Sequence, residues 1–146
     1  MKVFKLKKNN EHQIGHDIFN MKIEERKKIN CIVINNPAQS NCLCIINHLV
    51  CELAENKNIA HLVIASEDKV LKEITTFGNL NVGYKYDIAE ANGNLEIDIV
   101  NIDKNQEVDM LDDHFLIILP GGNLHIELEE PQGTMSLQIS VDQQII

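Results

Sequence analysis

The chain has 146 residues, of which 44% are hydrophobic and 24% charged, and this ordinary globular composition excludes wholesale disorder. No stretch approaches the roughly 20 apolar residues of a membrane-spanning helix, and the opening residues MKVFKLKKNN lack the apolar run of a secretory signal. The net charge of −9 divides into +4 over residues 1–30, −2 over residues 31–80 and −11 over residues 81–146, so the acidic last part excludes a nucleic-acid surface there.

The first third of the chain predicts alternating strands and helices. A strand over 2–7 and a helix over 17–28 precede the β-branched run CIVIN (31–35). Asn36 followed by Pro37 is typical of a helix start, which predicts a helix over 37–55. Apolar residues recur along it at helical spacing, namely Cys42, Ile45, Ile46, Leu49 and Leu53.

A second strand-to-helix unit follows. The run HLVIAS (61–66) predicts a buried strand, and Ser66 then caps a helix that Gly78 ends. Strand, helix and strand in this order predict two neighbouring parallel strands with a right-handed crossover.

The last part, residues 80–141, predicts strands with one apolar and one polar face, as in antiparallel sheets. The alternating runs 82–88 and 95–99 predict a hairpin. Pro120-Gly121-Gly122 predicts another hairpin bend rather than an active-site turn, because an alternating strand follows and no cysteine lies beyond Cys51. The apolar faces predict a set buried under the helices: Leu95, Ile97, Leu124, Ile126, Leu137 and Ile139.

Together these elements predict the α+β class. We expect one domain over 1–146, with an amino-terminal βαβα portion packed on a mainly antiparallel carboxyl-terminal sheet of about five strands.

One candidate ligand site lies at the predicted strand ends. Asn35, Asn36 and Ser40 open the predicted helix over 37–55, and Ser66 opens the next. Helix amino termini at the edge of an open α/β sheet bind polar or anionic small molecules, which would suit a small enzyme or a ligand-binding domain. The same residue types also serve as ordinary helix caps, so this reading is the alternative one.

Cys44, His48, Cys51 and Glu55 fall on one stripe of the predicted helix over 37–55. Thiolate, imidazole and carboxylate are zinc ligands, but seven residues of helix separate the two thiols by about 10.5 Å, too far for one ion without strain. We expect no metal site, and the stripe could equally pack in a homo-oligomer interface.

The chain carries no recognisable catalytic constellation, and we expect no cofactor. Acid collects instead on the polar face of the predicted carboxyl-terminal sheet, at Glu96 and Asp98 on one strand and Glu127 and Glu129 on another. Such a field attracts a cationic partner. The sequence therefore predicts a non-enzymatic binding module (an adaptor, a chaperone-like protein or an inhibitor) that acts on a basic protein; a merely solubilising surface is the other interpretation.

We also expect a cytoplasmic protein that binds neither nucleic acid nor membrane. Four cysteines are too few for a disulfide scaffold in a chain of this size, so we expect free thiols in a reducing compartment.

Overall fold

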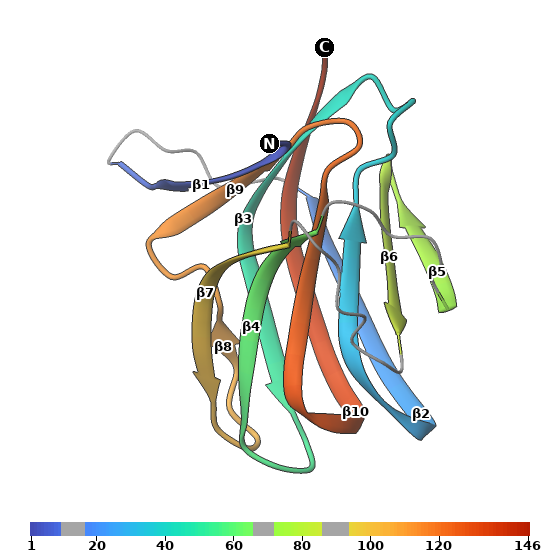
Figure 1. Cartoon of the computed structure of the whole chain (residues 1–146), viewed down its shortest axis with the longest axis vertical. Helices are drawn as coiled ribbons and strands as arrows, with labels where there is room; N and C mark the ends of the chain where they lie inside the picture. Colours follow the sequence, from blue (N-terminus) through green and yellow to red (C-terminus); the bar gives the residue numbers. More distant parts are fainter. Residues whose placement is uncertain (10–16, 66–71, 86–93) are drawn as a thin grey trace.

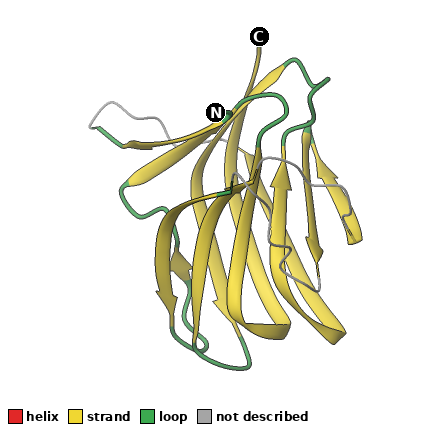
Figure 2. Cartoon of the chain, in the orientation of Figure 1, coloured by secondary structure: helices red, strands yellow, loops and turns green. Residues whose placement is uncertain are grey.

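The computed structural model describes residues 1–9, 17–65, 72–85 and 94–146. These residues form ten strands of one antiparallel sheet and contain no helix (Figures 1 and 2). The predicted α+β class is therefore wrong, because the fold is all-β. The strands are β1 (Val3–Lys7), β2 (Asp17–Asn35), β3 (Cys42–Leu53), β4 (Asn58–Ala65), β5 (Lys72–Phe77), β6 (Leu80–Lys85), β7 (Leu95–Ile102), β8 (Val108–Asp109), β9 (His114–Ile118) and β10 (Asn123–Ile145).

Two long strands fold the sheet into two layers. β2 and β10 pair with each other along almost their whole length, and the register shifts between Glu127 and Thr134. Figure 1 shows both strands turning back on themselves at this place. The pair acts as a bent ribbon whose two halves belong to opposite layers, because a bulge bends a strand and increases its twist.

Each layer is completed by strands that pair with one half of the ribbon. The front layer contains β4 and β7 beside the first half of β10, and β6 and β5 beside the second half of β2. The back layer contains β3 beside the second half of β10, with β8, β9 and β1 beyond it (Figure 1). The layers bury one shared core between their inner faces.

The inner faces follow the period-two alternation of strands. Leu124 and Ile126 of the front layer and Leu137 and Ile139 of the back layer are buried, which confirms four of the six predicted core residues. Leu95, by contrast, is 46% exposed, and Ile97 is only partly buried against the core. The covering helices of the prediction are absent from the described residues, and the second layer of strands takes their place.

The predicted helix over 37–55 is a turn followed by β3. Its core side chains are Cys42, Cys44, Ile46, Leu49, Cys51 and Leu53. The spacing is two residues on either side of Asn47, where the pairing with β10 skips from His48 to Ile46. This bulge adds one residue to the alternation, so the apolar pattern matches a helical period over a short window.

The other predicted helices fail for related reasons. The helix over 17–28 is the first half of β2, where Phe19, Met21 and Ile23 alternate toward the core. The helix after Ser66 lies partly outside the described residues, and its end is β5. Gly78, predicted to end that helix, lies between the paired strands β5 and β6 with φ of 60°. A helix end and a tight hairpin both use glycine for positive φ, so the residue alone does not distinguish them.

Strand pairing also differs from the prediction. β2 and β4 do run in the same direction, but β10 lies between them and is antiparallel to both. Among the described residues β6 and β7 pair with different strands and form no hairpin, while residues 86–88 of the predicted hairpin lie outside the described part of the chain. Pro120-Gly121-Gly122 likewise forms no hairpin, because it connects β9 of the back layer to the first half of β10 in the front layer. No helix in the described part of the chain could cross a membrane.

Candidate functional site

The outer face of the front layer carries a histidine between two carboxylates. His61 of β4 lies opposite Glu127 of β10 and opposite Ile99 of β7. From these neighbouring strands, Glu96 and Glu129 reach the imidazole ring. Nδ1 of His61 contacts Oε1 of Glu96, and Nε2 lies 2.7 Å from Oε2 of Glu129. The cluster therefore joins three strands through one ring.

The two carboxylates favour the protonated form of His61. The hydrogen bond to Glu129 and then that to Glu96 raise the pKa of His61, and together they outweigh the opposing effect of partial burial. An imidazolium can donate from both ring nitrogens, whereas the neutral ring donates from only one. His61 thus binds both acids in its charged state, and the group of three carries a net negative charge.

A hollow of about 390 Å³ continues this surface toward the end of the layer. Asp103, Glu129 and Glu130 line it, together with Lys57. Glu127 lies beside His61, and its Oε2 is buried without a hydrogen-bond partner among the described residues. We call this surface the acidic band; it consists of Glu96, Asp103, Glu127, Glu129 and Glu130 around His61.

Asp98 does not belong to the acidic band. Glu96 pairs with Val63 and Asp98 with Leu62, two successive residues of β4 that point to opposite faces of the layer. The bulge at Ile97 causes the separation, because it places the two acids out of phase. Asp98 accepts a hydrogen bond of 2.9 Å from Nζ of Lys5 in β1. Of the four residues predicted to bind a partner, the structure brings together Glu96, Glu127 and Glu129.

The basic amino-terminal strand pairs with acids of the same molecule. Besides the Lys5–Asp98 pair, Lys7 lies 3.9 Å from Asp113, and Lys8 donates to the carbonyl oxygen of Asp112. The charge asymmetry of the sequence is thus partly balanced within the fold.

The predicted ligand site around Asn36 is a turn with its own hydrogen-bond network. Asn36 is fully buried; its Nδ2 donates to the carbonyl oxygens of Cys42 (2.8 Å) and Ile118 (2.9 Å), and its Oδ1 accepts from Oγ of Ser40. Asn35 donates to Oδ1 of Asn123. These contacts anchor the start of β3 to β9 and β10, and the helix terminus that the ligand site required is absent. Ser66 lies outside the described residues.

The predicted stripe of Cys44, His48, Cys51 and Glu55 is divided between surfaces. Cys44 and Cys51 point into the core, and burial raises the pKa of each thiol to about 12. His48 points outward and binds Oδ2 of Asp109 at 2.7 Å. The described residues contain no cluster of three or more His, Cys, Asp or Glu side chains placed to hold a metal ion.

The carboxylate of Asp109 makes hydrogen bonds within the fold. Its Oδ1 accepts from the backbone amides of Leu49 (3.2 Å) and Leu111 (3.1 Å), while Oδ2 binds His48. Partial burial opposes ionisation, but the hydrogen bonds from His48 and the two amides outweigh it and lower the pKa of Asp109. The acid fixes the entry of the segment around β8 against β3.

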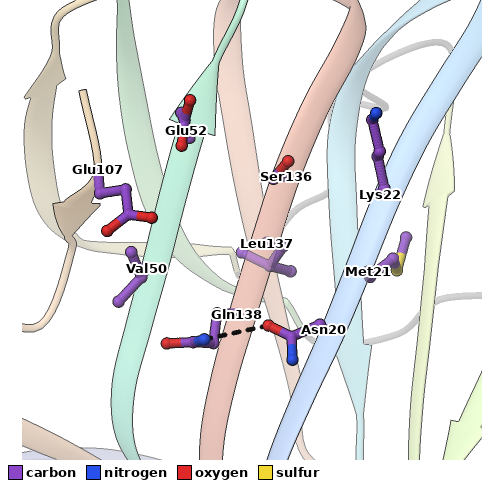
Figure 3. A pocket seen from close by; sticks show the side chains of 9 residues that line it. All are labelled: Asn20, Met21, Lys22, Val50, Glu52, Glu107, Ser136, Leu137 and Gln138. Carbon is purple, nitrogen blue, oxygen red and sulfur yellow. Dashed lines mark hydrogen bonds between the residues drawn. The ribbon is translucent and has the colours of Figure 1, made fainter. Parts of the chain in front are cut away.

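The outer face of the back layer carries a second hollow, of about 250 Å³. Figure 3 shows Lys22 of β2 and Glu52 of β3 on either side of Ser136 in β10, with Glu107 on the β3 side near Val50. Asn20 and Gln138, joined by a hydrogen bond of 3.1 Å, close one end (Figure 3).

Sequence reasoning missed His61 and the second hollow. His61 stands in a run whose other members alternate into the core, so period-two alternation could have placed it on a polar face. The second hollow has no such local signal, because its residues come from strands far apart in the chain. Comparison with family models, with curated proteins and with solved structures finds no match to this chain. The chemistry of its own surfaces is therefore the basis for a proposed function.

Proposed function

We propose that this chain is a non-enzymatic protein-binding module whose acidic band docks a basic segment of a partner protein. The single observation that supports the proposal most is the continuity of the band: the His61 cluster shares Glu129 with the hollow lined by Glu130 and Asp103. Among the described residues, the five carboxylates of the band outnumber the two cations within the cluster and the hollow, His61 and Lys57.

The band suits a cationic side chain in both shape and charge. The side chains of Glu96 and Glu129 are 45% and 50% exposed, so they can meet a partner without large desolvation. The hollow next to Glu129 has room for the head of a lysine or arginine, and several carboxylates around one cation add their attraction. Because the contacts are exposed, they should speed encounter and weaken as salt rises.

The proposal includes a cytoplasmic location. All four cysteines are free and buried, as suits a protein that stays in a reducing compartment.

A charge-neutralising variant tests the proposal with a defined probe, a fluorescent octapeptide of alternating lysine and valine. The band variant combines Glu96→Gln, Asp103→Asn, Glu129→Gln and Glu130→Gln. The control variant has the same net charge but changes exposed acids outside the band, Asp17→Asn, Glu24→Gln, Asp112→Asn and Asp113→Asn. Binding is measured by fluorescence anisotropy.

We expect the band variant to bind the peptide about tenfold more weakly or worse, and the control variant to stay within about twofold of the original protein. Raising salt from about 0.05 M to about 0.5 M should weaken binding to the original protein and have less effect on the band variant. Equal losses in both variants would overturn the proposal, because binding would then follow net charge alone. Absence of peptide binding at low salt would overturn it as well.

A further inference from the structure

The hollow on the outer face of the back layer arises from the size of the residues in one cross-strand row. Ser136 pairs with Lys22 of β2 on one side and with Glu52 of β3 on the other. A short hydroxyl side chain thus stands between two long charged ones. In the next row Gln138 pairs with Asn20 and Val50, and Gln138, longer than Ser136 and hydrogen-bonded to Asn20, closes that end of the hollow.

The charges at the two sides of the hollow have opposite sign. The ammonium group of Lys22 lies on the β2 side, and the carboxylates of Glu52 and Glu107 lie on the β3 side (Figure 3). Lys22 also lies 3.0 Å from Glu24, but both side chains of that pair are more than 60% exposed. An exposed ion pair of this kind contributes little stability, so Lys22 can turn to another anion at small cost.

The charges of Lys22 and Glu52 stand on strands that flank β10. Two strand spacings of about 4.8 Å place the backbones of Lys22 and Glu52 about 10 Å apart, with Ser136 on the strand between them. A molecule that meets both sides of the hollow presents a carboxylate to Lys22 and an ammonium group to Glu52.

We propose that this hollow binds a free α-amino acid with a small side chain. The carboxylate of the amino acid binds Lys22, its ammonium group binds Glu52 and Glu107, and the hydroxyl of Ser136 lies beneath it. A volume of about 250 Å³ lies below the usual range of ligand pockets, which begins at about 300 Å³, and therefore limits the side chain. This site lies on the opposite layer from the acidic band and does not depend on the proposed function.

Nuclear magnetic resonance titration of the isotopically labelled protein with L-alanine tests the proposal. We expect amide shifts confined to the three segments around the hollow, 20–22, 50–52 and 136–138. N-acetyl-L-alanine lacks the ammonium group and L-alanine amide lacks the carboxylate, so each should bind about tenfold more weakly than L-alanine or worse.

Two variants assign the two ends of the ligand. Lys22→Gln should weaken L-alanine about tenfold and abolish the difference between L-alanine and its amide, because only the carboxylate meets Lys22. Glu52→Gln should abolish the difference between L-alanine and N-acetyl-L-alanine. The matched controls Lys104→Gln and Asp112→Asn change exposed charges outside the hollow and should leave all three affinities unchanged.

Three results would overturn the proposal: no shifts at any L-alanine concentration, shifts only outside the three segments, or equal binding of L-alanine and both capped forms. Lys22 is exposed and Glu52 is half-buried at the sheet surface, and a urea unfolding curve for each variant establishes that it is folded before titration.

Discussion

On the front layer His61 and its two carboxylates come from three adjacent strands, whereas on the back layer Lys22 and Glu52 stand two strands apart with Ser136 between them. Side chains on adjacent strands are close enough to bind one another, and His61 accordingly binds both acids. Charges separated by a small residue on the strand between them leave a hollow instead. Strand spacing thus distinguishes a cluster whose members bind one another across adjacent strands from one whose charges flank a hollow.

The slow reaction of the buried cysteine thiols on the inner faces of the two layers is the largest effect that we expect. At pH 8 the thiols of Cys44 and Cys51 should react with iodoacetamide about a thousandfold more slowly than in the unfolded chain, because burial raises their pKa from 9.0 to about 12 and the thiolate is the reactive form. Site-resolved mass spectrometry measures the rates. Cys31 is buried outside the shared core cluster, so local opening should expose it sooner. A rapid reaction at Cys44 would contradict the inner position of that residue.

Truncation of one inner residue from each layer tests whether the layers share one core. Ile126→Ala in the front layer and Leu137→Ala in the back layer should each lower the free energy of unfolding by about 2–5 kcal/mol, since each leaves a cavity. Urea unfolding should remain a single transition in both variants. As a matched outer substitution, Ser136→Ala should change stability by less than about 0.5 kcal/mol. Two separate transitions would show that the layers unfold independently.

The His61 cluster should make stability depend on pH above 6.5, the ordinary pKa of histidine. The folded pKa of His61 lies above its unfolded value of 6.5, so the stabilisation is complete below that value and is lost as pH rises through the folded pKa. Urea midpoints over this range should fall for the original protein and stay flatter for His61→Gln. A paired variant, Glu96→Gln with Glu129→Gln, should lower the pKa of His61 measured by nuclear magnetic resonance; an unchanged value would refute the role of these acids.

Asp109 should give a smaller effect of opposite sign at acidic pH. Its folded pKa lies below its unfolded value of 3.8, so the stabilisation is present above that value and is lost as pH falls through the folded pKa. Asp109→Asn should cost about 1 kcal/mol at neutral pH, because the amides of Leu49 and Leu111 lose a charged acceptor. The free energy of unfolding is measured by urea denaturation, and the exposed substitution Asp112→Asn is the control. Equal effects of the two substitutions would contradict the anchoring role of Asp109.

Parts of this architecture were predictable from local patterns. The alternation of Leu124 with Ile126 and of Leu137 with Ile139 correctly predicted strands with a buried face, because a strand next to a core must bury every second side chain. The same alternation occurs in the first half of β2, where a helix was predicted: Phe19, Met21 and Ile23 point toward the core. It failed in β3, where the bulge at Asn47 shifts the alternation and makes the apolar spacing resemble that of a helix.

The candidate site was predictable only in part. The acidity of the last part of the chain pointed to Glu96, Glu127 and Glu129, but the bulge at Ile97 moved Asp98 to the other face, next to Lys5. His61 entered the site because β4 pairs with both β7 and β10.

By itself the sequence determined which residues are apolar, where several strands run, and that acid concentrates in the last part of the chain. Only the tertiary structure decided that β10 lies between β2 and β4, and that its two halves belong to opposite layers. The physical reason is that side-chain periodicity reports one buried face along a strand, whereas partner and register depend on contacts between residues distant in sequence. A single bulge changes which residues share a face, so a surface built from several strands exists only once those strands are paired.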